Sequence, residues 1–184
     1  MASVNIELAC ATDGWMSNEE LQWLAQQALS HERIVEIGSY LGRSTLALAC
    51  NSPGTVYALD DWHGPRDVPD PDPASVWQRF QASTRHVGNI VPVECDHSSP
   101  PDLGHPDMVF IDGSHEFEDV CRDIAHWRDC LASGGLLCGH DFDWDSVRRA
   151  VSQLLPGFRL VSHTTLWHWR EDFIPGRGTP GLRM

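Results

Sequence analysis

The chain has 184 residues, of which 41% are hydrophobic and 21% charged, and its formal net charge at pH 7 is −13. These values are typical of one globular domain with a real core, and they argue against disordered, fibrous and membrane-spanning classes, since no apolar run approaches ~18–20 residues. The negative surface repels phosphate groups, so we expect neither nucleic acid nor a membrane surface as a partner.

The first half of the chain alternates between helix and strand patterns. Ser17 and Glu20 have the spacing of a capping box, and apolar residues at three- and four-residue steps after them predict a helix that reaches Leu29. The predicted segments that follow are a strand (Arg33 to Ile37), a helix (Ser44 to Cys50), a strand (Thr55 to Leu59), a proline- and aspartate-rich surface loop (Gly64 to Ala74) and a helix (Val76 to His86).

The second half continues the alternation and then closes it. The predicted segments are strands at Asn89 to Glu94 and Met108 to Ile111, a helix at Glu116 to Leu131, a strand at Leu136 to Cys138, a helix at Asp145 to Leu155, two closing antiparallel strands at Phe158 to Ser162 and Leu166 to Trp169, and a loose tail over residues 171–184. Such alternation indicates βαβ units. The predicted fold class is therefore α/β, a doubly wound, mostly parallel sheet with an antiparallel closing strand in a single domain over residues 1–184.

Aspartates end or follow four of the five predicted parallel strands, at Asp60, Asp96, Asp112 and Asp141. Aspartate is common in turns, so each residue alone has an ordinary explanation. In open parallel sheets, however, ligands bind outside the carboxyl ends of the strands, near the point where strand order reverses. Four aspartates at one edge of a sheet exceed what turns require, and they predict a ligand site at that edge.

A glycine turn joins the first parallel strand to the next helix. Gly38 and Gly42 allow a sharp turn and close packing, and the amide groups at the start of the helix can bind polar parts of a ligand. The third glycine of the GxGxxG dinucleotide motif is missing, and so is the GK[ST] ending of a phosphate loop. Asp60 lies where a carboxylate can accept both ribose hydroxyls, and Asp96 where an adenine edge would fall. This order predicts a nucleoside pocket without a diphosphate clamp, although an ordinary strand–turn–helix connection would use the same glycines.

Four sequence motifs together resemble a known family. They are EIGSxxGRST from Glu36 to Thr45, DDW from Asp60 to Trp62, FIDGSH from Phe110 to His115, and the stretch from Gly134 to Asp141. The sequence resembles the class I S-adenosylmethionine-dependent methyltransferases, and within them the small bacterial and phage group related to catechol-type and macrolide-sugar O-methyltransferases. The resemblance covers nearly the whole chain. It implies a Rossmann-like fold and a single S-adenosylmethionine-binding methyltransferase domain.

The resemblance also implies a role for each motif. Asp112 and Asp141 resemble the metal ligands of the metal-dependent members, and His115 resembles the general base of the macrolide-sugar enzymes. His140 stands where those relatives place an acid, and strand alternation lets it ligate beside Asp141 only if the strand ends at Gly139. A mixed nitrogen and oxygen donor set leaves magnesium as the expected ion, with manganese or iron as alternatives. The implied cofactor-binding residues are Glu36, Gly38, Ser39, Gly42, Ser44, Asp60, Asp61, Asp96 and Asp112.

The implied reaction is methyl transfer from S-adenosylmethionine to a hydroxyl of a small molecule, a sugar or a phenolic metabolite, assisted by a divalent metal and a histidine base. Three alternatives stay open: a metal-dependent hydroxylase-like relative on the same fold, a non-catalytic S-adenosylmethionine-binding domain, and a nicotinamide dehydrogenase, which the missing third glycine disfavours. The loop over 64–74 is predicted to cover the acceptor site, and Trp15, Trp62 and Trp144 are predicted to line it.

The first ten residues lack a basic region followed by a long apolar stretch, so no secretion signal is predicted. The six cysteines form no CxxC pair, and we expect reduced, mostly buried thiols rather than zinc ligands or disulfides. These features predict a cytoplasmic protein whose partner is a small-molecule acceptor. The identity of the acceptor and the oligomeric state, a homo-oligomer included, are left open.

Overall fold

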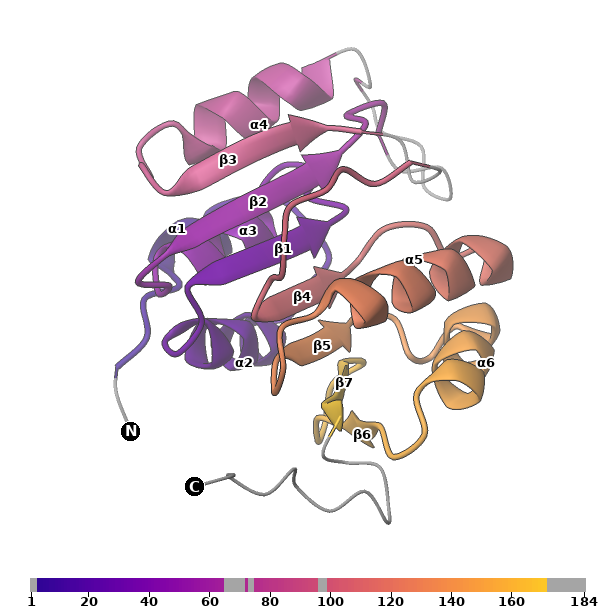
Figure 1. Cartoon of the computed structure of the whole chain (residues 1–184). Coiled ribbons are helices and arrows are strands. Elements are labelled where there is room, and N and C mark those ends of the chain that lie inside the picture. The colour runs from indigo at the N-terminus through magenta and orange to yellow at the C-terminus, as the bar shows by residue number, and fades with distance from the viewer. Residues whose placement is uncertain (1–2, 65–71, 73–74, 96–98, 172–184) are drawn as a thin grey trace.

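The computed structural model describes residues 3–64, 72, 75–95 and 99–171, and in them seven strands form one sheet in the order β3-β2-β1-β4-β5-β7-β6 (Figure 1). The first five strands are parallel, and β7 pairs antiparallel with both β5 and β6. The predicted α/β fold class, with its antiparallel closing strand, is confirmed. The strands are β1 (Arg33–Ile37), β2 (Thr55–Asp60), β3 (Ile90–Glu94), β4 (Met108–Ile111), β5 (Leu136–Gly139), β6 (Arg159–Leu160) and β7 (Trp167–Trp169).

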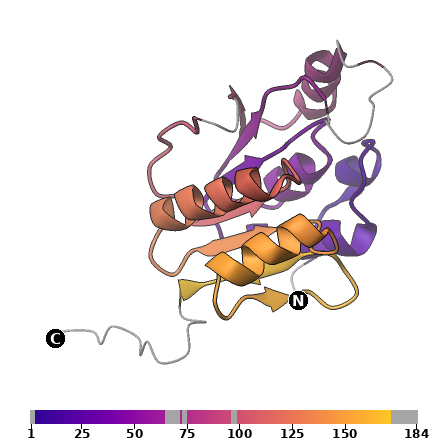
Figure 2. The same ribbon diagram turned by 90° about the vertical axis from the view of Figure 1, so that its right-hand side faces the viewer.

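Helices of the described residues cover both faces of this sheet, α2 and α3 on one face and α5 and α6 on the other (Figures 1 and 2). None of them is long and apolar enough to cross a membrane. The helices are α1 (Glu7–Cys10), α2 (Asn18–Ala28), α3 (Arg43–Ala49), α4 (Val76–Thr84), α5 (Phe117–Cys130) and α6 (Asp145–Leu154).

Strand alternation sorts the core into two layers. In β4, Met108 and Phe110 pack with residues of α2 and α3, whereas Val109 and Ile111 pack with residues of α5 and α6. All four residues are buried, which is why β4 is a continuous apolar run rather than an alternating one. With both faces covered, the ends of the strands are the places where the sheet can meet a ligand.

The strand order places a switch point between β1 and β4. From β1 the chain runs outward to β2 and β3, and it then returns to the other side of β1 to form β4 and β5. The connections therefore diverge above the carboxyl ends of β1 and β4, and such a crevice is where open parallel sheets bind their ligands.

The element boundaries agree closely with the predictions. The strands Arg33–Ile37 and Met108–Ile111 have the predicted bounds, and the predicted capping box at the start of α2 is confirmed in both directions. The helix α1 was not predicted, because four residues are too few to show a helical period. The predicted loop over 64–74, except Gly64 and Asp72, lies outside the described residues, as do Asp96 and the predicted tail beyond residue 171.

The expected burial of the cysteines was wrong. All six are free thiols, but only Cys138 is buried, while the other five are exposed or half-buried. Four of those five, Cys10, Cys50, Cys95 and Cys130, end or directly follow a helix or strand, where the core no longer covers the side chain.

Candidate active site

A pocket of about 190 Å³ lies at the carboxyl ends of β1, β2 and β4, at the switch point. Among the sequence-predicted cofactor residues, Glu36 and Gly42 lie behind this pocket rather than on its wall. A larger pocket of about 350 Å³, which includes Gly134 and Gly135, lies by the amino end of β5 and contains none of the predicted site residues. The predicted residues that line the switch-point pocket are Gly38, Ser39, Ser44, Asp60, Asp61 and Asp112.

The glycine turn lets two strand ends approach each other. Gly38 has a φ of +87°, and a Cβ added there would lie 2.1 Å from the carbonyl oxygen of Asp112. Gly42 has a φ of +90°, and its added Cβ would lie 2.7 Å from Cγ2 of Thr84 on α4. Both positions therefore require glycine for conformation and for space. The predicted sharp turn is present, and the close contact at Gly38 is with β4.

A buried carboxyl group accepts hydrogen bonds from residues of the glycine turn and of the helix that follows it. Glu36 is fully buried and accepts hydrogen bonds from the hydroxyls of Ser39, at 2.8 Å, and Thr45. Burial raises the pKa of Glu36 to about 7, although these hydroxyls lower it in part. Glu36 thus holds Ser39, which lines the pocket, while its own side chain is not part of the pocket lining.

Two carboxylates stand at the end of β2. Asp60 accepts the backbone N–H of Tyr40 at 2.8 Å and that of Trp62 at 2.6 Å, one on each carboxylate oxygen. Asp61 accepts the backbone N–H of His63 at 2.9 Å. Both side chains line the pocket, and carboxylate oxygens are acceptors for hydroxyl groups of a ligand.

An N-terminal loop forms one wall of the pocket. Arg43, the first residue of α3, donates to the carbonyl oxygens of Thr12 at 2.6 Å and of Met16 at 3.1 Å, and so holds the loop between them. Within that loop Trp15 is 61% exposed and stacks on Tyr40, with ring centroids 5.1 Å apart. Trp15 lines the switch-point pocket, and its predicted role in lining an acceptor site stays a prediction.

The other two tryptophans differ from each other. Trp62 is buried and packs against Trp77 and Phe80 of α4, so its predicted role in lining an acceptor pocket was wrong. Directly after β2 the chain turns its side chain into the core that α4 covers. Trp144, which is 44% exposed, stacks on His115 with ring centroids 4.2 Å apart, and it therefore lies at the site.

A cluster of ionisable groups lies beside the pocket, where β4 and β5 end. One donor atom each from Asp112, His140 and Asp141 lies within 4.8 Å of the others. Nδ1 of His140 is 3.3 Å from Oδ1 of Asp112 and 3.1 Å from Oδ1 of Asp141. β5 ends at Gly139 and Asp141 has a φ of +58°, so strand alternation stops before His140. The condition for His140 to face the same opening as Asp141 is met.

The space around Gly139 explains why this position is a glycine. A Cβ at Gly139 would lie 2.3 Å from the ring of Trp167 on β7, and the indole N–H of Trp167 donates to the carbonyl oxygen of His140 at 3.2 Å. The closing strand therefore packs onto β5 and holds the backbone just before the cluster.

The charges in the cluster are strongly coupled. Burial lowers the pKa of His140, but the surrounding carboxylates raise it more, so that it lies well above its ordinary value. Burial raises the pKa of Asp141, but hydrogen bonds with His115 and His140 lower it more, so that it lies well below its ordinary value. Two half-buried carboxylates this close are stabilised by a positive charge between them, which a protonated imidazole or a divalent cation can supply.

His115 is oriented by one member of the cluster. Its Nε2 lies 2.7 Å from Oδ2 of Asp141, and the Trp144 ring covers one face of its imidazole. The two oxygens of Asp141 thus have different partners, His115 on one side and His140 on the other. The structure brings the predicted base and the predicted ligands to one place.

The ionisable cluster adjoins the switch-point pocket. A small cavity lined by His115, His140 and Asp141 shares Asp112, Gly113 and Ser114 with that pocket. One nitrogen and two carboxylate oxygens are ligands for a borderline divalent ion such as manganese or iron, and they also suit magnesium where water completes the shell. The residues therefore fit the metal that the sequence predicted.

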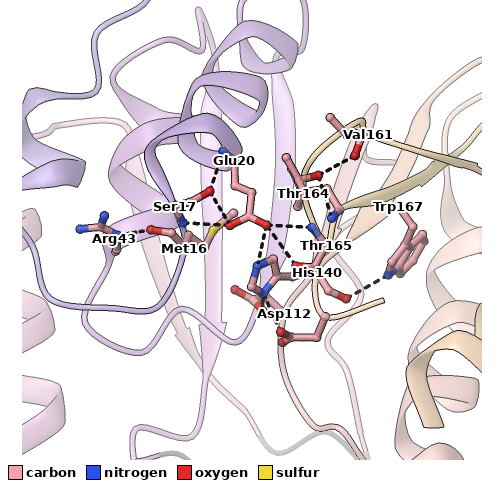
Figure 3. A network of polar contacts seen from close by, with 12 residues as sticks. Met16, Ser17, Glu20, Arg43, Asp112, His140, Val161, Thr164, Thr165 and Trp167 are labelled. Carbon is pink, nitrogen blue, oxygen red and sulfur yellow. Dashed lines mark hydrogen bonds and ion pairs between the residues drawn. The ribbon is translucent and has the colours of Figure 1, made fainter. Parts of the chain in front are cut away.

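Sequence reasoning missed one residue of this site. Glu20 was predicted only as part of the α2 capping box, yet its Oε1 lies 3.3 Å from Nε2 of His140 (Figure 3). Burial raises the pKa of Glu20, but hydrogen bonds from His140, then from the backbones of Thr165 and Ser17, hold it well below its usual range. The sequence carries no signal for this contact, because α2 meets the end of β5 only in the folded chain.

Comparisons with known proteins point in one direction. A family model described as a methyltransferase domain matches residues 35–142. That segment includes the glycine turn, the carboxylates at the end of β2, and Asp112, His115, His140 and Asp141. No curated protein matches the chain.

Several solved structures share the fold. The cofactor-bound Rv0187 from MTB is 19% identical with a TM-score of 0.65, and the match covers 88% of this chain and 84% of that one. The O-methyltransferase TomG from Streptomyces achromogenes, solved with SAM, is 16% identical with a TM-score of 0.62, over 85% and 81% of the two chains. The N-methyltransferase NodS from Bradyrhizobium japonicum, solved with S-adenosyl-L-homocysteine, is 17% identical with a TM-score of 0.61, over 83% and 86%. At these identities the likeness establishes the fold.

Proposed function

The chain belongs to the family of methyltransferase domains, and from that premise we propose that it transfers a methyl group from S-adenosylmethionine to a hydroxyl of a small molecule, with a divalent metal and a histidine base. The predicted resemblance to the class I S-adenosylmethionine-dependent methyltransferases is confirmed at the level of family and fold. The acceptor, the metal and the base are the proposed parts.

One observation carries the proposal: the switch-point pocket and the ionisable cluster share the wall made by Asp112, Gly113 and Ser114. A nucleoside cofactor held on one side of this wall places its reactive end near groups that can bind and deprotonate a hydroxyl on the other side. Alignment of two bound partners accounts for a large part of the rate in such displacements. We propose that Gly38, Ser39, Ser44, Asp60, Asp61 and Asp112 contact the cofactor, with Glu36 and Gly42 supporting the turn and Asp96 on the adenine side.

S-adenosylmethionine supplies an activated methyl group on a sulfonium that is a good leaving group. His115 is proposed to remove the hydroxyl proton of the acceptor. Because Asp141 holds Nε2 of this imidazole at 2.7 Å, the proton would go to Nδ1, and the carboxylate then stabilises the imidazolium that forms. Such base catalysis typically contributes about 10²–10⁴-fold.

Asp112, His140 and Asp141 are proposed to hold a divalent ion, magnesium or, given the histidine, manganese or iron. When bound, such an ion lowers the pKa of a hydroxyl that coordinates it. The acceptor is proposed to be small, a sugar or a phenol, and not a nucleic acid, because a net charge of −13 repels phosphate. A cytoplasmic location goes with this proposal.

The experiment that tests the proposal is transfer of a radiolabelled methyl group from S-adenosylmethionine to panels of phenols and deoxysugars, with magnesium, manganese or excess chelator. We expect transfer to a hydroxyl that needs a divalent ion. Full activity in excess chelator would contradict the proposed metal dependence. Transfer to amine acceptors alone would contradict a hydroxyl as the methyl acceptor.

A further inference from the structure

The structure assigns a positioning role to Glu20: we infer that its carboxylate holds the Nε2–H of His140 and thereby turns Nδ1 toward Asp112 and Asp141 as a metal ligand. The inference rests on the proposed function for the presence of a divalent ion. It goes beyond that function because it concerns what orients the one nitrogen ligand.

The His140 ring lies between acidic groups from three parts of the fold. On one side, Nε2 is 3.3 Å from Oε1 of Glu20 on α2. On the other side, Nδ1 is 3.3 Å from Oδ1 of Asp112 and 3.1 Å from Oδ1 of Asp141. The His140 side chain is only 9% exposed, so water does not compete freely for either nitrogen. Figure 3 shows the ring between Glu20 and Asp112.

Glu20 is itself held firmly. Its Oε2 accepts the backbone N–H of Ser17 at 2.8 Å and the Ser17 hydroxyl at 2.9 Å, while its Oε1 accepts the backbone N–H of Thr165 at 3.0 Å and the Thr165 hydroxyl at 3.1 Å. Oε2 therefore caps α2, whereas Oε1 contacts both the β6–β7 connection and His140. A side chain with both oxygens engaged and 5% exposure cannot swing away from the imidazole.

The chemistry of imidazole makes this contact decisive. A neutral histidine has one N–H and one lone pair, and the partner of one nitrogen determines which nitrogen carries the proton. A carboxylate acceptor at Nε2 favours the tautomer with Nε2–H and a lone pair on Nδ1, which is the nitrogen that faces Asp112 and Asp141. The opposite tautomer would place a lone pair against the negative charge of Glu20. Carboxylate groups orient metal-bound histidines in this way.

The experiment measures Mn²⁺ affinity of the full-length chain by electron paramagnetic resonance, and compares Glu20→Gln with Ser17→Ala. An amide at position 20 cannot accept from both sides, so we expect Glu20→Gln to bind Mn²⁺ about 10–100-fold more weakly. Ser17→Ala is the matched control, because it weakens the same cap at Oε2 and leaves every contact of Oε1 in place. We expect it to bind Mn²⁺ like the wild type.

Equal Mn²⁺ affinity of Glu20→Gln and the wild type would overturn the inference, and so would equal losses in Glu20→Gln and Ser17→Ala. Binding of S-adenosylhomocysteine by each variant reports whether the fold and the cofactor pocket are intact, and it is expected to be unchanged. Absence of any Mn²⁺ binding by the wild type would overturn the Glu20 role together with the metal, while S-adenosylhomocysteine binding would still decide the methyltransferase proposal separately.

A second measurement needs no variant at Glu20. With Zn²⁺ as a diamagnetic probe, ¹⁵N chemical shifts of His140 in the wild-type protein identify the protonated and the metal-bound nitrogen. We expect a proton on Nε2 and the ion on Nδ1. A proton on Nδ1, or the ion on Nε2, would contradict the role of Glu20 even if Glu20→Gln failed to fold.

Discussion

On the β1–β2 side of the candidate active site, backbone groups fix the pocket, whereas on the β4–β5 side charged side chains fix one another. Asp60 accepts two backbone amides, and Gly38 lies against the carbonyl oxygen of Asp112. Across the shared wall, His140 lies among three carboxylates and Asp141 bonds two histidines. The first side depends on shape and the second on charge.

This difference predicts which property is lost when residues on each side are substituted. Added volume on the backbone-built side should damage folding and cofactor binding, because no flexible side chain can move away. Loss of charge or of a nitrogen on the other side should damage the chemistry or metal binding and spare the cofactor. Substitutions on the two sides should therefore have separable effects.

On the charged side, His115→Ala should reduce turnover about 10²–10⁴-fold, the usual contribution of a general base. Binding of S-adenosylhomocysteine should persist, and Mn²⁺ should still bind, although more weakly because His115 hydrogen-bonds the proposed ligand Asp141. Steady-state kinetics and calorimetry check both halves. Turnover within a few-fold of the wild type would show that another group takes the proton.

On the backbone side, Gly38→Ala should destabilise the fold by about 3 kcal/mol or more, because its Cβ would lie 2.1 Å from a backbone oxygen at a φ of +87°. Gly134→Ala is the matched control, since Gly134 has a φ of +76° and a Cβ there meets nothing within 4 Å. The control should cost about 1–2 kcal/mol, the price of conformation alone. Urea denaturation measures both, and equal losses would contradict the close contact of β1 with β4.

At the end of the pocket that is proposed to hold the ribose, Asp60→Ala should weaken S-adenosylhomocysteine binding by about 1–3 kcal/mol, the cost of leaving polar groups unpaired. Mn²⁺ affinity should stay unchanged, because Asp60 lies on the other side of the shared wall. Calorimetric titrations of both ligands test the prediction. Equal losses of S-adenosylhomocysteine and Mn²⁺ affinity would show that the two sides of the site are not independent.

The smallest effect concerns a buried acid outside the site. Asp123 on α5 is 3% exposed, and among the residues that the structure describes its Oδ2 has no hydrogen-bond partner, in contrast to Glu20. Burial, with Asp119 nearby, raises the pKa of Asp123 from 3.8 to about 7. The folded chain therefore binds a proton between about pH 4 and 7 that the unfolded chain does not, and stability falls as pH rises through that window.

Asp123→Asn removes this titration, so its stability relative to the wild type should improve by about 1.4 kcal/mol between pH 6 and pH 8. Thermal or urea unfolding at the two pH values measures the change. A constant difference between the two proteins across this range would mean that Asp123 is ionised in the folded state.

The same division explains how much could be predicted from the sequence. The strands, the helices longer than one turn and the glycine turn have local signals, so their positions agree closely with the predictions. Asp112, His115 and Asp141 could be named because each lies within a short motif at a strand end. The conformation of Gly38 follows from its own turn.

Contacts between distant segments could not be predicted. Glu20 meets His140 only because α2 and the end of β5 come together in the fold, and its capping role gave a sufficient explanation on its own. Trp62 was placed in the acceptor pocket because it follows a strand end, but α4 offers it an apolar surface instead. The sequence predicted which residues lie at the carboxyl edge of the sheet, but not the direction in which their side chains point.

The most direct test of the central claim is a calorimetric titration of S-adenosylhomocysteine into the full-length protein, with NAD as the competing ligand. We expect one equivalent of S-adenosylhomocysteine to bind, NAD not to displace it, and Asp60→Ala to weaken it. Absence of binding to the wild-type protein, or a preference for NAD, would rule out S-adenosylmethionine as the cofactor.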